Sequence, residues 1–333
     1  MASTAYGDIS PRTAAYAQKE LLRRGIPYLV IEKFGQANSI PANSTKTTKF
    51  RRYNALPNTP QALVEGVTPA GSTLTHTDIT ATLVQYGDKV TISDVIEDTH
   101  EDPVLKEAMV LLGEQASQMI EKMRFGVLKA GTNVLYANGA SRSAVNTALS
   151  LTLVRRAVRT LKRQNARFIT SIVRSTPDYG TEAVAPGFVA LIHPDCAGDV
   201  RNLVDAGGKS VFTPAEKYGS ITPWENELGK AEDVRFVQST IFEPWPDAGG
   251  AAGTMISTTG TSADVYPILV IARDAYGITA LKGMFAITPM VVNAKPSDSD
   301  PLAQRGHAGW KTMQTAQILN DAWMCRLEVA ATN

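Results

Sequence analysis

The chain has 333 residues, which is enough for one large domain or for two to three smaller ones. Hydrophobic residues make up 44% of it and charged residues 20%, as is typical of a folded globular protein. The formal net charge of +1 excludes a polycation that coats nucleic acid with its whole surface.

The cysteines and the N-terminus indicate where the protein works. Cys196 and Cys325 lie far apart, which favours free thiols in a reducing compartment over a disulfide framework. The start "MASTAYGDISPRTAAYAQKELLRRG" lacks the apolar stretch of a signal peptide, and no apolar run reaches the length of a membrane span. We therefore expect a cytoplasmic protein without a membrane partner.

The first fifty residues are typical of an arm more than of a core. Residues 13–25 can form a short helix that ends at Gly25 and Pro27. Residues 28–35 are compatible with a strand, and "QANSIPANSTKTTKF" then reads as a loop with rising basic charge. The alternating stretch "TTKFRRYN" (47–54) predicts a strand.

A long polar segment follows. "EGVTPAGSTLTHTDITATLVQY" (65–86) holds six threonines in 22 residues and few long apolar side chains, and it continues into "KVTISDVIED" (89–98). Threonine favours extended backbone because its branched Cβ restricts χ1. We predict an extended two-stranded ribbon, which is marginal on its own because it has too little apolar face.

The strongest local pattern predicts a long helix over 103–130. Apolar residues recur there at three- and four-residue steps, Asp102 and Pro103 suit its start, and Gly131 suits a left-handed C-terminal cap. The acidic residues before it complement the helix dipole.

Residues 150–168 predict a second amphipathic helix, with Ser150 as its N-cap. Seven basic residues and no acidic one lie between Leu151 and Pro177. This surface either faces phosphates without sequence preference or pairs with acidic residues elsewhere in the fold or on a neighbour.

The remaining elements are mixed. A buried strand at 188–195 is expected to lead to a short helix capped by Asp195, and further strands are expected at 233–240 and within 264–281. The segment 244–262 reads as a flexible loop, and the tail "GWKTMQTAQILNDAWMCRLEVAA" as a strand, a tight turn at Asn320-Asp321 and a return strand. The fold class is therefore α+β.

No motif predicts an active site or a cofactor. "DAGGKS" (205–210) ends like a phosphate loop, but Leu203 stands where the first glycine is needed. His193 and Cys196 could begin a metal site, yet the other histidines have no paired spacing and a closed zinc site needs four ligands. We expect no catalytic, cofactor-binding or metal-binding residue, and no enzyme.

The order of these elements resembles the major capsid proteins of tailed bacteriophages with the Hong Kong 97-like fold. The stretches "EGVTPAGSTLTHTDITATLVQYGDKVTISDVIEDTHEDPVLKEA" and "GWKTMQTAQILNDAWMCRLEVAA" are similar to the coat family of N-four-like phages. The resemblance implies five parts: an N-terminal arm (1–45), an extended loop that forms a ribbon (46–95), a spine helix with part of the peripheral domain (96–149), a mainly axial domain (150–285), and C-terminal strands that return to the peripheral domain (286–333).

The resemblance also implies a function. Such proteins form hexamers and pentamers that close into an icosahedral shell around double-stranded DNA, assembled in the host bacterial cytoplasm. Because the chain starts directly at the arm, a separate scaffolding protein is expected, beside portal and decoration proteins. The alternative is an enzyme or small-molecule binder whose 60–85 ribbon is a lid.

Two sets of residues are the candidates for the shell function. The basic helix supplies the candidates that would face DNA in the interior: Arg155, Arg159, Lys162 and Arg163. The ribbon region supplies the candidates for contacts between subunits: Lys49, Arg51, Arg52, Glu65, Thr75, Thr77, Thr80 and Thr82.

Overall fold

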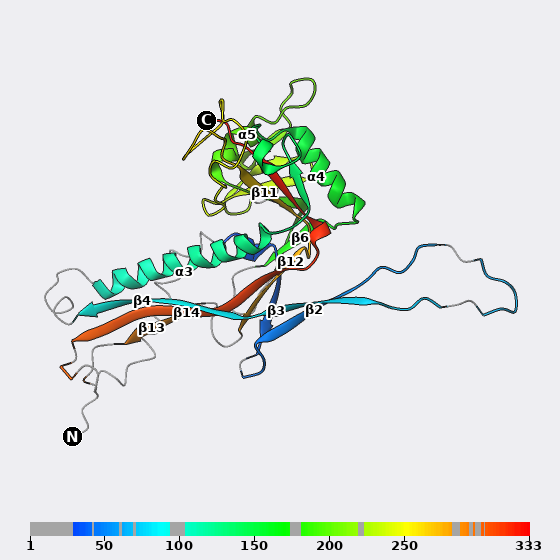
Figure 1. The fold of residues 1–333 in the computed structure, drawn as a ribbon. Coiled ribbons are helices and arrows are strands. Elements are labelled where there is room, and N and C mark those ends of the chain that lie inside the picture. The colour runs from blue at the N-terminus through cyan, green and yellow to red at the C-terminus, as the bar shows by residue number, and fades with distance from the viewer. Residues whose placement is uncertain are drawn as a thin grey trace.

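The computed structural model describes residues 29–41, 43–59, 62–68, 71–93, 104–173, 181–218, 223–281, 287–292, 296, 301–302 and 304–333. Its strands form an eight-stranded sheet, a five-stranded sheet and a separate two-stranded ribbon (Figure 1). The predicted α+β class is confirmed. The helix expected at 13–25 and the caps expected at Asp102 and Pro103 lie outside the described residues.

The helical elements, where η marks a 3-10 helix, are η3 (Ile31–Lys33), α3 (Val104–Leu128), η4 (Arg142–Ala144), α4 (Leu151–Arg163), η5 (Pro194–Cys196), α5 (Ala197–Arg201), η6 (Ala215–Lys217) and η7 (Asp321–Trp323). The strands are β1 (Gln36–Ile40), β2 (Thr47–Tyr53), β3 (His76–Thr82), β4 (Val84–Ser93), β5 (Val134–Tyr136), β6 (Ile169–Val173), β7 (Thr181–Ile192), β8 (Phe212–Pro214), β9 (Glu227–Ala231), β10 (Val234–Gln238), β11 (Tyr266–Ile271), β12 (Tyr276–Leu281), β13 (Thr288–Val292), β14 (Arg305–Ile318) and β15 (Met324–Val329).

The eight-stranded sheet is buried on both faces. Along β7, Phe188, Ala190 and Ile192 pack into one core cluster with α4, whereas Val189 and Leu191 pack into a second cluster with Phe125 of α3. Because both faces are covered, the strand reads as an unbroken apolar run, which is why it was recognisable in the sequence. Ser150 caps α4 as predicted: its hydroxyl oxygen accepts a hydrogen bond from the Leu153 amide at 3.3 Å.

The five-stranded sheet is built on β14, the longest strand of the fold. β4 runs antiparallel to it over Arg305–Gln314, and β13 and β12 pair with other parts of it. Helix α3 lies along this sheet (Figure 1) and buries Met109, Leu112, Ala116 and Ile120 against it.

The glycine after α3 has a different role from the one predicted. Gly131 does not have a positive φ, so the expected left-handed cap is wrong. A Cβ at this position would lie 2.8 Å from both the Asp321 carboxylate and the Met324 side chain. Glycine is needed at position 131 because Asp321 and Met324 leave no room for a side chain there.

Two of the passages of the chain between the two large sheets lie at neighbouring places. β11 belongs to the eight-stranded sheet and the next strand, β12, to the five-stranded one. β14 belongs to the five-stranded sheet and the next strand, β15, to the eight-stranded one. The Ala275 carbonyl accepts hydrogen bonds from the Leu319 and Asn320 amides, which ties the crossings together. A strand does follow the turn at Asn320-Asp321, as predicted, but it does not return alongside β14: β15 pairs with β11 and β5 instead.

Three further local predictions are wrong. The stretch expected as a strand at 28–35 contains η3, and β1 lies in the expected loop after it. Asp195 does not cap the short helix: the His193 side chain caps η5, and Asp195 accepts a hydrogen bond from the Tyr266 hydroxyl. The segment 244–262 is not a free loop, because bridges such as Trp245 with Val265 hold it.

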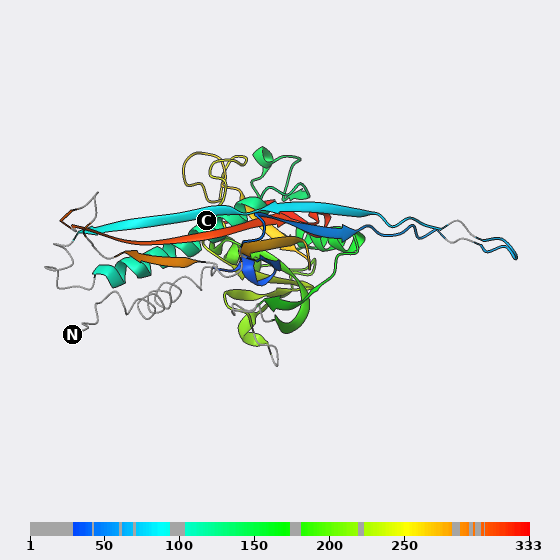
Figure 2. The same ribbon diagram turned by 90° about the horizontal axis from the view of Figure 1, so that it is seen from below.

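The ribbon and the five-stranded sheet extend in opposite directions, as both views of the fold show (Figures 1 and 2). β2 and β3 form the predicted ribbon over Thr47–Tyr53 and His76–Thr82, but Val84–Ser93 leaves it and joins β14. The ribbon is thus shorter than the expected 46–95. Within the part of the chain that the structure describes, no helix is long and apolar enough to cross a membrane.

Candidate assembly and nucleic-acid surfaces

The base of the ribbon is anchored to its own chain by one face. Phe50 and Ala81 are buried there and pack with Leu319, and the Phe50 ring lies over Gly277, where a Cβ would come within 2.8 Å of it. The partner that the ribbon was expected to need is thus supplied at its base by β12 and the end of β14. The opposite face of the ribbon stays exposed.

The ribbon candidates occupy three different environments. Lys49, Thr80 and Thr82 are exposed on the free face. Arg51 on that face makes a bidentate pair with Asp78 at 2.8 Å, so its guanidinium is already occupied. The others lie toward the far end: Arg52 is half-buried, and Thr75 and Thr77 are exposed and hydrogen-bond Asn54.

Beyond the paired strands, the described residues between 54 and 75, namely 54–59, 62–68 and 71–75, form a distal loop that exposes aliphatic side chains. Among its described residues, exposed fractions of 76% for Leu63, 65% for Val64 and 62% for Val67 are far above those of core residues. Glu65 is the only charged residue between 54 and 75. These aliphatic residues were not predicted as a contact surface, although the stretch "ALVEGV" (62–67) carries them in the sequence.

A second exposed apolar surface lies on the five-stranded sheet, on the face away from α3. Asp88 and Trp310 hydrogen-bond Gln115 of α3, so the alternating residues Lys89 and Gly309 face the other way. A hollow of about 470 Å³ opens on this face, lined by Gly87, Asp88, Lys89, Met290, Val292, His307, Gly309 and Trp310. We call it the sheet hollow. No feature of the sequence alone had indicated it, because its residues come from three strands.

The sheet hollow combines exposed aliphatic side chains with three polar ones, Asp88, Lys89 and His307. Met290 and Val292 are 47% and 56% exposed, which is unusual for side chains of their size. A Cβ on Gly309 would lie 2.8 Å from the Asp88 carbonyl oxygen, so glycine keeps the floor of the hollow low. Lys89 and His307 supply the basic groups at its edge.

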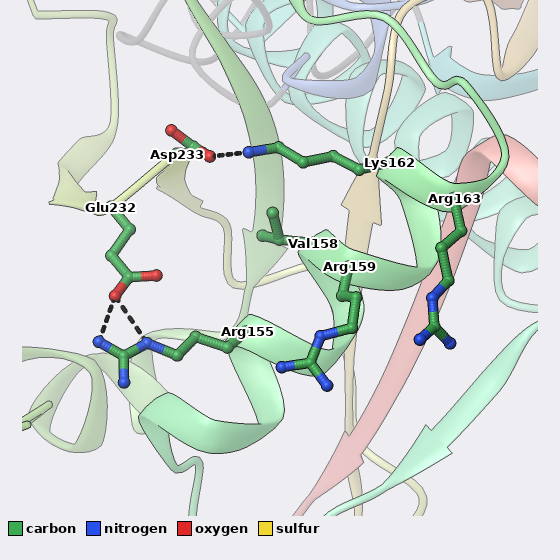
Figure 3. A pocket seen from close by; sticks show the side chains of 7 residues that line it. All are labelled: Arg155, Val158, Arg159, Lys162, Arg163, Glu232 and Asp233. Carbon is green, nitrogen blue, oxygen red and sulfur yellow. Dashed lines mark hydrogen bonds and ion pairs between the residues drawn. The ribbon is translucent and has the colours of Figure 1, made fainter. Parts of the chain in front are cut away.

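The four predicted basic residues of α4 do lie together (Figure 3). They line a hollow of about 440 Å³ with Val158, Glu232 and Asp233. Arg155 pairs with Glu232 at 2.6 Å, and Lys162 pairs with Asp233 at 2.5 Å. Arg159 and Arg163, one turn apart and exposed, make no ion pair with any described residue.

The motifs that suggested chemistry have structural roles. In "DAGGKS" the Asp205 carboxylate accepts hydrogen bonds from the Gly207 and Lys209 amides, so the loop uses its own anion where a phosphate would bind. Cys196 is fully buried, and burial raises the pKa of its thiol. Among the described residues, no three His, Cys, Asp or Glu side chains are grouped as metal ligands.

Comparison with known proteins identifies the family. Residues 77–298, about two thirds of the chain, match the family described as phage capsid protein. The chain belongs to the phage capsid protein family. No curated protein matches it.

The fold of this phage capsid protein is also found in solved capsids. The Ralstonia phage GP4 capsid is 14% identical, with a TM-score of 0.67 over 90% of this chain and 87% of the other. The cyanophage Pam1 capsid is 13% identical, with a TM-score of 0.62 over 100% of this chain and 95% of the other. The cyanophage P-SCSP1u capsid is 14% identical, with a TM-score of 0.57 over 91% and 88%.

The family decides between the two functions considered from the sequence. The chain is a major capsid protein that forms the shell of a virion from identical subunits, and it is a structural protein instead of an enzyme. The alternative of an enzyme with the 60–85 segment as a lid is therefore wrong. The exposed surfaces of the ribbon, the distal loop, the sheet hollow and α4 are best considered as contact surfaces.

Proposed function

We propose that the protein assembles into hexamers and pentamers of a closed icosahedral shell around double-stranded DNA, as a member of the N-four-like coat group. Assembly takes place in the host bacterial cytoplasm, with separate scaffolding, portal and decoration proteins. On this proposal the arm, expected over 1–45, is confined to the residues before 29, because η3 and β1 belong to the folded body; α3 with the five-stranded sheet is the peripheral domain, and the eight-stranded sheet with α4 is the axial domain. The resemblance of the quoted stretches supports these assignments.

The observation that carries the proposal is the pair of exposed apolar surfaces at opposite ends of the molecule. The distal loop lies beyond the ribbon, and the sheet hollow lies on strands that run the other way (Figures 1 and 2). A subunit cannot place its own loop in its own hollow, but it can place the loop in the hollow of a second copy. Such a head-to-tail contact closes into a ring when the rotation between copies permits.

The two surfaces are complementary in chemistry. The loop offers Leu63, Val64 and Val67 around a single carboxylate, Glu65. The hollow offers Met290 and Val292 beside the basic groups of Lys89 and His307.

Each contact would thus remove aliphatic surface from water and pair Glu65 with Lys89. Burial of a Val or Leu side chain contributes about 1.5–3 kcal/mol, so most of the affinity comes from the apolar part, and the charge pair fixes the register.

The test is a charge exchange across this contact. Glu65→Lys and Lys89→Glu each place like charges opposite each other, at a cost of about 1 kcal/mol per contact that recurs throughout a shell. We expect each single variant to give folded subunits with few closed particles in electron micrographs, and the double variant to regain them.

Lys106 provides the control for this exchange, because it is exposed on α3, away from the sheet hollow. Lys106→Glu should assemble normally and should not rescue Glu65→Lys. Normal particles from both single variants, or a double variant no better than either, would contradict the proposed contact.

The proposed DNA contact rests on α4. Arg159 and Arg163 make no ion pair with described residues and lie exposed in the hollow that α4 forms with Glu232 and Asp233 (Figure 3). Two free guanidinium groups suit two phosphates of a DNA backbone. The other reading of this helix, pairing within the fold, applies to Arg155 and Lys162. We therefore assign the interior-facing role to Arg159 and Arg163 in particular.

A further inference from the structure

A buried carboxyl group joins α3 to the first described residues of the chain. Glu121 lies on α3 and is 0% exposed. Its Oε1 atom accepts hydrogen bonds from two successive backbone amides, those of Val30 at 3.1 Å and Ile31 at 2.8 Å. These amides begin η3, which has no side-chain cap of its own. Glu121 therefore does for η3 what an N-cap residue does, but from another element.

Polar side chains from η3, α3, β12 and β14 surround Glu121. Arg124, one turn along α3, pairs with Glu32 of η3 at 2.9 Å and donates to Gln314 of β14 at 2.7 Å. Tyr276 of β12 donates its hydroxyl to the Ile31 carbonyl at 2.5 Å. The charged and titratable groups that face Glu121 are thus Arg124, Glu32 and Tyr276, with uncharged Gln314 and Thr312 on β14.

Only half of the Glu121 carboxyl group has a partner. Its Oε2 atom is buried and makes no hydrogen bond, and the Nε atom of Arg124 is also without one. An ionised carboxylate in this place carries charge on an oxygen that neither water nor a donor solvates, which is costly. A proton on the carboxyl group removes the buried charge, and an opening that admits water solvates the oxygen.

The direction of the titration follows from burial. Desolvation raises the pKa of Glu121 to about 7, against the opposing effects of Arg124 and the two amides. Since the pKa is raised on folding, the folded state binds the proton more tightly than the unfolded state. The resulting stability is fully present below the ordinary value of 4.5 and is lost as the pH rises through about 7.

We propose that Glu121 is a proton-sensitive clasp, which holds residues 29–34 on α3 when it is protonated and loosens them when it is ionised. The contacts that carry this inference lie within one chain, so the clasp does not depend on any contact between copies. Its consequence rests on the proposed function: if the residues before 29 are the arm, the clasp sets how firmly the arm is rooted on the spine helix.

Hydrogen exchange of the full-length protein between pH 5 and 9, corrected for the intrinsic pH dependence of exchange, tests the clasp. The protection of the Val30 and Ile31 amides should fall by up to about tenfold per pH unit as the pH rises toward about 7 and should level off above it, as expected for opening linked to one proton. Strand β11, in the core of the other sheet, should show no such change. Equal protection of Val30 and Ile31 across this range would overturn the proposal.

Two substitutions sharpen the measurement. Glu121→Gln keeps an oxygen that accepts from both amides but cannot titrate, so its protection should be independent of pH. Glu225→Gln is the matched control, because Glu225 pairs with Lys33 of the same η3 from the exposed side, at 2.9 Å.

The Glu225 variant should keep the wild-type pH dependence; loss of that dependence would assign the effect to the surface pair. If Glu121→Gln does not fold, the wild-type profile alone decides. The charge exchange between Glu65 and Lys89 is measured by particle formation, whereas the clasp is measured by hydrogen exchange. The proposed function and the clasp can therefore be refuted independently.

Discussion

Ion pairs within the chain divide the basic residues of α4 into two classes that their sequence does not distinguish. Arg155 and Lys162 have acidic partners on the turn that follows β9, at Glu232 and Asp233. Arg159 and Arg163 have the same exposure and helical face but no such partner among the described residues. The paired cations already have much of their charge neutralised, so a DNA phosphate gains less from them.

This division predicts unequal effects of neutralising substitutions. Replacing Arg159 and Arg163 by glutamine should weaken binding of double-stranded DNA and lower the slope of log affinity against log salt by about one per lost phosphate contact. The matched variant with Arg155 and Lys162 replaced should change the slope less. The measurement is a salt titration of DNA binding by purified subunits, and equal slopes for both variants would refute the assignment.

At the scale of elements, α3 shows how adjacent residues serve opposite faces. Leu112 is 3% exposed and packs against the five-stranded sheet, whereas its neighbour Leu111 is 58% exposed. Leu112, and not Leu111, falls on the three- and four-residue steps of apolar residues along the helix, and it is the one that the structure buries. The two leucines therefore form a matched pair for testing what the helix contributes to stability.

Leu112→Asp should prevent recovery of soluble folded protein, because it buries an unpaired charge and leaves a cavity, and the cavity alone costs about 2–5 kcal/mol. Leu111→Asp should fold with nearly the wild-type melting temperature. Soluble yield and thermal melting measure both. A Leu112 variant that melts like the wild type would show that the α3–sheet contact does not support the fold.

The local sequence pattern was sufficient to predict elements that it specifies by itself. It was insufficient for features that depend on which distant segment packs or pairs with them. The helices α3 and α4 and the apolar strands β7 and β11 were predictable, because periodicity and capping report them directly. The transfer of β15 to a different sheet was not, since the Asn320-Asp321 turn signal says nothing about which sheet each strand joins. Glu121 and Arg124 were invisible for the same reason: their burial depends on η3 and β14, about 90 and 190 residues away.

The contact surfaces follow the same rule. The basic set on α4 was predictable because one helix carries all four residues, but its division into paired and unpaired residues depends on Glu232 and Asp233. The free face of the ribbon was predictable from the alternation of β2 and β3. The sheet hollow was not, because β4, β13 and β14 must first be assembled.

At the scale of the whole molecule, a single subunit exposes its two apolar surfaces, the distal loop and the sheet hollow, at opposite ends. The threonine-rich strands of the ribbon present polar side chains. The loop beyond them exposes large aliphatic side chains instead. On the proposed contact, each of these apolar surfaces is buried only when it meets another copy, which favours closed assemblies over free monomers.

The distal loop can be removed without disturbing the ribbon, because Asn54 and Thr75 face each other: the Asn54 amide donates to the Thr75 carbonyl at 2.9 Å. Replacing residues 55–74 by Asn-Gly should close β2 and β3 with a two-residue turn and change the free energy of unfolding by about 0.5 kcal/mol or less. We expect light scattering and electron micrographs to show folded subunits without closed shells. A full-length variant with Leu63, Val64 and Val67 replaced by serine should behave alike, since the side chains and not the length of the loop make the contact. Normal shells from the serine variant would show that the aliphatic residues do not hold the copies together.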